Sequence, residues 1–444
     1  MSLSIENAAT MVPLSGDGPI RGEAMRSIEV LEGASVMIDA GVVASVGNGA
    51  GGGEGRAGGG EGRAGGGEGR ADGGEGRADG GEVAIDATGC TVVPGFVDPH
   101  THLPFFGWRA DEDAARLSGL RYETLHKESG GIFRSQRMFA DAGDGEVLSF
   151  AASLASQMLR KGTTTFETKS GYGLTIEAEL RQLRLARRLA GAVPQTVVTT
   201  CLAAHACPPG KGEGEWIGEI AEQLLPQVAA EGLAHAADIY VESIAFQLEH
   251  AARLKTTTDK LGMRMRMHAD QLEDSQAGSF AARWGLQSAD HLNHTSLAAV
   301  GDIAASDTAA VLLPGATFTL RQNKKPPARN LIEEGAIVAL GTDLNPGTSP
   351  IHSMPFAIAL ACRIYGLRPL EALVAATVNA AYTIGLDDQV GRIMPGRRAD
   401  LVVLDVPDFE SLCYRPDHDA VLAVVCGGDL VHVAPGAESR VTVH

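Results

Sequence analysis

The sequence has no long apolar run and no recognisable export signal. No stretch of about 18 apolar residues that could cross a bilayer is present. The N-terminal segment MSLSIENAATMVPLSGDGPI lacks the basic region and following apolar core of a signal peptide. We therefore expect no membrane span and a cytoplasmic protein.

Clustered cysteine and excess positive charge are also missing. The formal net charge is −18 at pH 7, whereas nucleic-acid binding depends on clustered Lys and Arg. The cysteines show neither the CxxC spacing of a zinc knuckle nor the density of a disulfide framework. We interpret them as reduced thiols: Cys90, Cys201, Cys207, Cys362, Cys413 and Cys426. The expected partner is a small molecule, with no nucleic acid and no membrane.

What is present is the composition of a globular enzyme. Of 444 residues, 44% are hydrophobic and 21% are charged, which is enough for a sizeable core. One segment differs: from Gly51 the unit GGGEGRA repeats with small changes through Glu82. It offers no large apolar side chain to bury, so residues 51–82 are predicted to be a disordered insertion.

Short β-branched runs broken by glycine flank this insertion and recur near the other end of the chain. SVMIDAGVVASVG (35–47) and EVAIDATGCTVVPGFVD (82–98) predict consecutive strands of a hairpin with the insertion at its tip. GRRADLVVLDV (396–406) and AVLAVVCGGDLVHV (420–433) are again strand-like. We expect the two ends to pair in a small composite β-sandwich domain of residues 1–94 and 395–444.

The middle of the chain alternates apolar strands with amphipathic helices. Strands are predicted at TTTFET (163–168), QTVVTTCLAAHA (195–206), RMRMHAD (264–270) and AIVALGTD (336–343). Helices are predicted at VLSFAASLASQMLRKG (147–162), EAELRQLRLARRLAG (177–191) and PLEALVAATVNAAYTIG (369–385). This alternation predicts an α/β fold, with a (β/α)8 TIM barrel over residues 95–394.

Candidate metal ligands follow several of these strands. In VVPGFVDPHTHL, His100 and His102 lie two apart at a strand end and can point the same way, although an isolated HxH is as often structural. His205, His268 and Asp343 each close another apolar strand, and active sites of such barrels lie where strands end. Two histidines, His268 and Asp343 suit a catalytic Zn²⁺ or Fe²⁺. His291, in SADHL, is a candidate acid-base group.

At these residues the chain resembles a known family. PGFVDPHTH, a late GTD and a β-sandwich built from both termini resemble the amidohydrolase superfamily. More closely, five blocks are similar to signatures of the imidazolonepropionase family: ETKSGYGL (167–174), AAHACPP (203–209), HADQ (268–271), SADHL (288–292) and LGTDLNPGTSP (340–350). The resemblance covers nearly the whole chain apart from the insertion.

The resemblance implies one Zn²⁺ or Fe²⁺/Fe³⁺ per subunit, bound by His100, His102, His268 and Asp343, with Lys169 outside the ligand set. It implies a homodimer that opens the ring amide of 4-imidazolone-5-propanoate to N-formimidoyl-L-glutamate in histidine degradation. The implied substrate-binding residues are Arg109, Tyr122, Tyr172, His205, Gln271, Asn345, Gly347 and Thr348.

Chemical reasoning on single residues leaves alternatives open. Arg109 could pair bidentately with a propionate carboxylate or, in FFGWRADEDA, with a surface Asp. Tyr172 lies between two glycines, which favours a loop at a strand end, and NPGTSP could be only a turn. The chain departs from the family in Trp108, where a small residue is expected before the arginine, and in SGGI (129–132) where GGGI is common.

The expected mechanism assigns proton transfer to Asp343. It would accept a proton from a metal-activated water and deliver it to the leaving ring nitrogen. His291, if protonated, would stabilise the oxyanion. Gln271 cannot act as a base and would orient the ring or the water. The alternatives are another mononuclear amidohydrolase, acting on a different cyclic amide or as an aromatic deaminase, and a catalytically silent binding protein.

Overall fold

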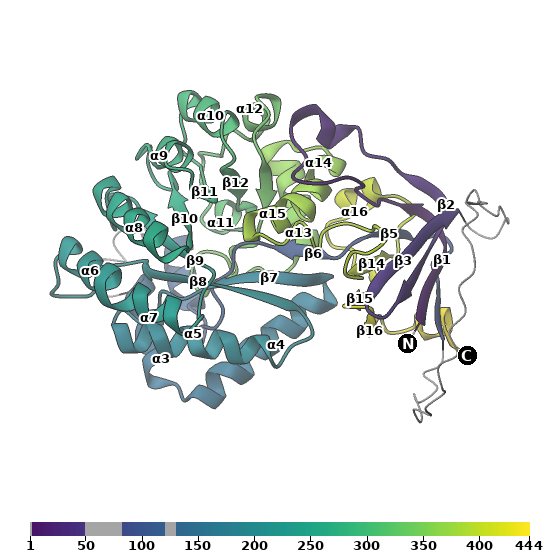
Figure 1. Cartoon of the computed structure of the whole chain (residues 1–444), viewed down its shortest axis with the longest axis horizontal. Helices are drawn as coiled ribbons and strands as arrows, with labels where there is room; N and C mark the ends of the chain where they lie inside the picture. The colour runs from purple at the N-terminus through teal and green to yellow at the C-terminus, as the bar shows by residue number, and fades with distance from the viewer. Residues whose placement is uncertain (1, 49–81, 120–129) are drawn as a thin grey trace, which may run out of the picture.

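The computed structural model describes residues 2–48, 82–119 and 130–444, and two sheets organise it (Figure 1). The larger is an eight-stranded sheet in which neighbouring strands are parallel and follow the chain order from β6 to β13. Its strands are β6 (Phe96–Asp98), β7 (Thr163–Lys169), β8 (Thr196–Ala204), β9 (Ala236–Val241), β10 (Arg264–Ala269), β11 (Ser288–His291), β12 (Ala309–Leu312) and β13 (Val338–Leu340). Helices surround this sheet, so the predicted (β/α)8 barrel is confirmed.

The helices bury their apolar faces against the barrel. In the 176–190 helix, Leu180, Leu183 and Leu189 are buried at helical spacing, and the Thr175 side chain accepts a hydrogen bond from the Ala178 N–H at its start. The α-helices are α1 (Ala110–Leu117), α3 (Gly131–Asp141), α4 (Asp144–Arg160), α5 (Ile176–Ala190), α6 (Glu213–Glu219), α7 (Leu225–Ala230), α8 (Leu248–Leu261), α9 (Ala277–Arg283), α10 (Leu297–Ala304), α11 (Pro314–Thr319), α12 (Ala328–Glu333), α13 (Met354–Leu360), α14 (Pro369–Ala375), α15 (Val378–Ile384) and α16 (Phe409–Tyr414).

The barrel closes through contacts just beyond the ends of β6 and β13. Thr101 and Leu344 form an isolated parallel bridge, and the His102 N–H donates to the Leu344 carbonyl at 2.9 Å. The Asp98 carboxylate accepts hydrogen bonds from the backbone and the hydroxyl of Thr342. Burial raises the pKa of Asp98 to about 7. The first and last barrel strands therefore meet beside the HxH motif.

The two ends of the chain form a second, nine-stranded mixed sheet, at the right of Figure 1. Its strands are β1 (Ser2–Met11), β2 (Leu31–Asp39), β3 (Val42–Asn48), β4 (Val83–Asp86), β5 (Thr91–Pro94), β14 (Leu401–Leu404), β15 (Val421–Cys426), β16 (Asp429–Val433) and β17 (Val441–Val443). The two ends meet where β5 pairs antiparallel with β14. Pairing between the chain ends is thus confirmed, while the boundaries at 94/95 and 394/395 stay a prediction.

The predicted hairpin around the insertion is wrong. β3 pairs with β2, whereas β4 pairs parallel with β1, so β2 and β1 lie between the two flanking strands. The hairpin in this region is β2–β3, whose tight turn contains Gly41 with a φ of 83°. Alternation identified the strands, but it carries no information about which strand each one pairs with.

The predicted helix over 369–385 is interrupted. α14 ends at Ala375 and α15 begins at Val378, and Thr377 between them has φ −132° and ψ −96°. The break lets the Ala376 carbonyl accept a hydrogen bond from the Val97 N–H of β6 at 2.9 Å. A helix-period pattern therefore spans two helices, each with mostly buried residues.

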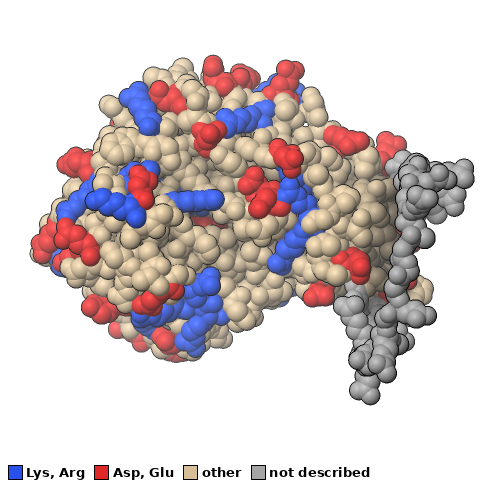
Figure 2. Space-filling view, in the orientation of Figure 1, with Lys and Arg blue, Asp and Glu red and all other residues tan. Residues whose placement is uncertain are grey.

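On the face in Figure 2, Lys and Arg are interspersed with Asp and Glu. Among the described residues, no helix has the length and apolarity needed to cross a bilayer.

Most of the insertion lies outside the described residues, but its flanks constrain any replacement. Asn48 is level with Ala34 and hence with Ala8, whereas Val83 is level with Leu3. From Asn48 to Val83 the chain must cross three strand spacings and move five residues back along the sheet, a distance of about 22 Å. Because an extended chain covers at most about 3.5 Å per residue, a tight turn cannot bridge this distance.

We therefore predict that replacing residues 51–82 with about twelve Gly/Ser residues keeps thermal stability, metal content and turnover. A matched variant with a two-residue turn should lose stability, because it must pull β3 or β4 out of the sheet. Thermal unfolding and metal analysis of both variants test this. Loss of metal in the longer-linker variant would contradict it.

Candidate metal and substrate site

Four strands deliver five ionisable side chains to the C-terminal end of the barrel. His100 and His102 follow β6, His268 lies on β10, His291 ends β11, and Asp343 follows β13. All five are buried, with exposed fractions of 3% or less. Strand ends of a parallel barrel meet at one rim, which explains why residues so distant in sequence converge.

The possible ligand atoms of these residues form two groups that share His100. Asp343 Oδ1 lies 3.5 Å from His100 Nε2 and 3.2 Å from His102 Nε2. His100, His102 and Asp343 form one group of potential ligand atoms within 4.8 Å, and His100, His268 and His291 form another. The structure thus brings all four predicted ligands together and adds His291 to the cluster.

The orientation of the histidines fits a metal ion. His100 Nδ1 lies 2.6 Å from Asp290 Oδ2, and His268 Nδ1 lies 3.2 Å from Asp238 Oδ1. The opposite Nε2 atoms of His100 and His268 are buried without a hydrogen-bond partner in the described part of the chain. A carboxylate behind an imidazole fixes its ring and leaves the other nitrogen free to ligate, as in carboxylate–histidine–metal arrangements.

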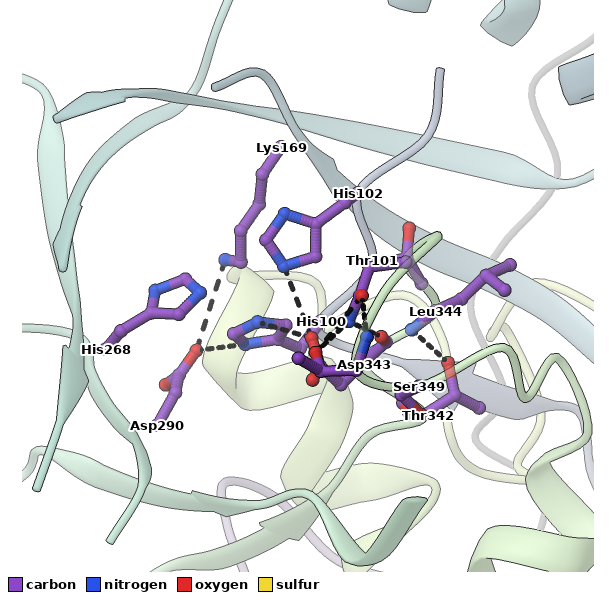
Figure 3. A network of polar contacts seen from close by, with 12 residues as sticks. His100, Thr101, His102, Lys169, His268, Asp290, Thr342, Asp343, Leu344 and Ser349 are labelled. Atoms are coloured by element: carbon purple, nitrogen blue, oxygen red, sulfur yellow. Dashed lines mark hydrogen bonds and ion pairs between the residues drawn. The ribbon is translucent and has the colours of Figure 1, made fainter. Parts of the chain in front are cut away.

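Buried charged residues lie beside these histidines, and Figure 3 shows two of them, Lys169 and Asp290. The sequence analysis named Lys169 but did not single out its charged neighbours. Lys169 Nζ lies 2.9 Å from Glu167 Oε1, 2.9 Å from Asp238 Oδ2 and 4.0 Å from Asp290 Oδ2. Arg266 Nη2 also lies 3.1 Å from Asp290 Oδ2. All five side chains are at most 1% exposed. The signal was available: a TIM barrel interior is normally filled by branched apolar residues, and charges at these strand positions are unusual.

The charges in this region do not balance without a cation. The carboxylates of Glu167, Asp238, Asp290 and Asp343 face the cations Lys169 and Arg266. Two negative charges remain, and buried net charge is costly. One divalent ion would neutralise them.

Burial also determines the protonation of the site. It lowers the pKa of His100 and His102 well below the usual value, and it lowers that of His291 to about 3. Burial raises the pKa of Asp343, which favours a carboxylate able to take up a proton. The lowered pKa of His291 favours its neutral imidazole, which can still donate one hydrogen bond.

Most predicted substrate residues line one pocket with the histidine cluster. Arg109, Tyr172, His205, Gln271, Asn345 and Thr348 all line it, together with Ile132 and Tyr240. The His205 ring stacks on His102 with centroids 5.2 Å apart. Tyr122 lies outside the described residues. Trp108 is not among the described lining residues and instead packs edge-on against Phe105 and Phe150.

The Tyr172 loop is held by residues that the sequence analysis did not single out. Glu179, in the first turn of α5, accepts backbone hydrogen bonds from Gly171, Gly173 and Leu174. Gln182, one turn later, accepts one from the Tyr172 N–H. These contacts fix the loop after β7 at the pocket wall. Its glycines allow the backbone conformation that these hydrogen bonds require.

Arg109 is buried rather than on the surface. It is 5% exposed, and its Nε and Nη1 have no hydrogen-bond partner among the residues described. Glu112 lies nearby, with Oε2 3.7 Å from Nε. A Cβ on Gly347 would lie 1.2 Å from Arg109 Nη2, so Gly347 serves to make room for the guanidinium.

The Asn345 side chain, which lines the pocket, also organises its own loop. Its side-chain oxygen accepts the N–H groups of Gly347 and Thr348, and its Nδ2 donates to the Asp343 carbonyl and to Thr348 Oγ1. NPGTSP is therefore a turn, built around the Asn345 amide. The turn places Gly347 against Arg109 and Thr348 in the pocket wall.

Comparison with known proteins assigns this architecture. Residues 91–431 match the model of the amidohydrolase family. The chain is 38% identical to an imidazolonepropionase from Symbiobacterium thermophilum over 97% of each chain. It is 40% identical to one from Rubrobacter xylanophilus, covering 97% of this chain and 98% of that protein. An imidazolonepropionase from Deinococcus radiodurans is 37% identical over 96% and 99% of the two chains.

Solved structures agree on the fold. A zinc-bound adenosine deaminase from Xanthomonas campestris aligns with a TM-score of 0.66 at 19% identity, over 97% of this chain and 93% of that one. The guanine deaminase of E. coli aligns with a TM-score of 0.67 at 16% identity, over 98% and 99%. Identities this low show a common fold and carry no information on the substrate.

The geometry predicts which substitutions remove the metal. His100→Ala and His268→Ala should lose most of the bound ion and nearly all activity, because each removes an imidazole held by a carboxylate. His205→Ala is the matched control, which should keep the ion and fail mainly in substrate binding. Metal analysis of the purified variants measures this. An empty site in His205→Ala would overturn the ligand assignment.

Removal of the ion should destabilise the whole barrel. The chelated protein keeps two unbalanced buried negative charges, and an ion at about a thousand times its Kd contributes on the order of 4 kcal/mol to the native state. Calorimetry should therefore show a lower Tm after chelation that returns when Zn²⁺ is added. An unchanged Tm in protein verified to be metal-free would contradict the charge balance.

Proposed function

This chain belongs to the amidohydrolase family and, within it, to the imidazolonepropionases, and from this premise we propose its reaction. It hydrolyses the ring amide of 4-imidazolone-5-propanoate to N-formimidoyl-L-glutamate, a step of histidine degradation. The observation that carries the proposal is the placement of Arg109 in one pocket with the histidine cluster. The Arg109 guanidinium, which can bind a carboxylate, thus lies in the same pocket as the proposed hydrolytic centre.

The metal is proposed to be one Zn²⁺ or Fe²⁺/Fe³⁺ per subunit, bound by His100, His102, His268 and Asp343. Three imidazoles and one carboxylate suit either metal and leave room for water. When bound, such an ion lowers the pKa of water toward neutrality and polarises a carbonyl.

The protein's own residues then bind substrate and move the proton. Arg109 pairs with the propionate, while Tyr172 and His205 orient the ring against the cluster. Asp343, whose Oδ1 lies 3.2 Å from His102 Nε2 at the centre of the cluster, takes a proton from the attacking water and returns it to the ring nitrogen as the C–N bond breaks. Neutral His291 donates a hydrogen bond to the oxyanion, and Gln271 orients ring or water.

From membership in the family we also propose roles for the remaining substrate-site residues. Tyr122 contacts the substrate, and Asn345, Gly347 and Thr348 form the loop that supports Arg109 and contacts substrate or product. The enzyme acts as a homodimer in the cytoplasm. The composite terminal domain comprises residues 1–94 and 395–444, and the barrel comprises residues 95–394.

A second candidate function is deamination of an aromatic ring, because a zinc-bound adenosine deaminase shares this fold. The environment of Arg109 distinguishes hydrolysis of the imidazolone from this deamination. The buried Arg109 Nε and Nη1 have no hydrogen-bond partner among the described residues and suit a carboxylate, whereas a neutral heterocycle would leave such donors unsatisfied at a cost of about 1–3 kcal/mol.

We predict graded loss of substrate binding at Arg109. Arg109→Lys keeps the charge and loses the bidentate fork, and Arg109→Met loses both, so KM should rise in that order. Metal content should stay unchanged, because Arg109 does not belong to the ligand group. Steady-state kinetics beside metal analysis measure both quantities.

A substrate with a neutral amide in place of the carboxylate is the internal control. It should be poor for the wild type and gain relative to the acid in Arg109→Met, since an unpaired acid is costly to desolvate. If acid and amide lose equally in the variant, Arg109 does not read the carboxylate, and the deaminase alternative becomes stronger.

A further inference from the structure

Gln271 lies in the pocket wall just beyond the end of a strand. β10 ends at Ala269, and Asp270 after it has a φ of 51°, so the chain leaves the sheet before it reaches Gln271. Gln271 lines the pocket with the histidine cluster and is 7% exposed. Because strand pairing no longer holds the backbone here, the orientation of this side chain depends on contacts from other segments.

A carboxylate on the neighbouring strand provides the first of these contacts. Val241 of β9 pairs with Ala269, and Glu242 follows Val241 directly. Glu242 Oε1 accepts the N–H groups of Gln271 and Leu272, the latter at 2.9 Å. Glu242 is 1% exposed and is not among the described residues that line the pocket. It therefore reaches the site only through the backbone of Gln271.

An amide holds the other side of the same residue. Gln322 Nε2 donates to the Gln271 carbonyl at 3.1 Å. Gln322 Oε1 accepts a hydrogen bond from Asn293 Nδ2 at 3.0 Å, and the buried Asn293 also donates to Thr317 Oγ1 at 2.8 Å. Since Asn293 occupies the oxygen of Gln322, the NH₂ group of Gln322 faces Gln271. The N–H and the carbonyl of Gln271 are thus both bound by side chains from other loops.

We propose that Glu242 and Gln322 are positioning residues, which fix the backbone of Gln271 so that its amide points at the substrate ring or the attacking water. The inference rests on the role given to Gln271 under the proposed function. An amide that orients a reacting group contributes only while its own position is fixed, and a displacement of about 1 Å costs up to about a hundredfold in rate.

The same two loops contain a second link that serves as a matched control. The exposed Glu273, two residues after Gln271, accepts the N–H of Ser243 at 3.0 Å. Glu242 and Glu273 therefore each join the loop after β9 to the loop after β10, and of these two carboxylates only Glu242 is bonded to Gln271. Loss of Glu273 reports on the link between the loops, and loss of Glu242 reports also on Gln271.

The test is steady-state kinetics of the metal-loaded, full-length protein on 4-imidazolone-5-propanoate, or on whichever cyclic amide or aminated heterocycle it turns over fastest. Glu242→Ala should lower kcat/KM by up to about a hundredfold, divided between KM and kcat as in Gln271→Ala. Glu242→Gln keeps an acceptor oxygen and should recover most of the activity. Gln322→Glu keeps the acceptor for Asn293 and loses the donor, so it should behave like Glu242→Ala. Glu273→Ala should match the wild type.

A double-mutant cycle separates positioning from stability. In the Gln271→Ala background, Glu242→Ala should cause little further loss of kcat/KM, because the amide that Glu242 positions is gone. The loss of thermal stability should be the same in both backgrounds, since the same two N–H groups lose their acceptor. Hydrogen exchange of residues 270–276 gives a readout independent of turnover: Glu242→Ala should speed it and Glu242→Gln should not.

The outcomes separate this inference from the proposed function. A wild type that acts on another ring and not on the imidazolone would overturn the substrate alone, and the cycle is then measured on that ring. Equal losses of kcat/KM in both backgrounds would overturn the inference alone, as would unchanged hydrogen exchange in Glu242→Ala. Wild-type kinetics in Gln271→Ala would overturn the role of Gln271 and this inference together. If Glu242→Ala does not fold, Gln322→Glu takes its place in the cycle.

Discussion

Burial of charge beneath the barrel mouth is the constraint on which the site depends. Asp238 and Asp290 must be buried to hold His268 and His100, and burying them requires Lys169 and Arg266 beside them. The remaining negative charge makes the native barrel incomplete without a cation. Metal binding, the orientation of the imidazoles and the stability of the fold thus depend on the same buried charges, which neighbouring strands contribute.

The terminal sheet contributes to this arrangement through β6. Only Gly95 separates β5 from β6, and a Cβ there would lie 2.2 Å from Thr164 Oγ1. The Gly95 N–H also donates to the Asp400 carbonyl at 2.8 Å, which ties the junction to the C-terminal part of the chain. The strand that carries His100 and His102 is therefore placed by the sheet on one side and by barrel closure on the other.

The sequence predicted the barrel and most of the site because strand ends of a parallel barrel share one rim. Their positions at the ends of predicted strands were enough to name His100, His102, His268 and Asp343 as candidate ligands, with no knowledge of the distances between them. The carboxylate partners could not, because pairing of Asp290 with His100 depends on strand register across the barrel. The hairpin around the insertion failed for the same reason, since alternation does not specify strand neighbours.

Backbone conformation limited the prediction further. Asp343 and His291 have φ values of 58° and 78°, in the left-handed region that side chains with a Cβ seldom adopt. At β11 this departure lets consecutive residues, Asp290 and His291, both serve the cluster, which strict alternation along a strand would forbid. Such positions are common at functional sites and cannot be derived from residue periodicity.

The function proposed for this site is the hydrolytic opening of a cyclic amide that carries a carboxylate. The most direct measurement is turnover of freshly prepared 4-imidazolone-5-propanoate by the metal-loaded protein, beside a panel of other cyclic amides and aminated heterocycles. We expect N-formimidoyl-L-glutamate as the product and a kcat/KM for this substrate well above that for every panel member. Faster release of ammonia from an aminated heterocycle, with little opening of the imidazolone ring, would contradict it.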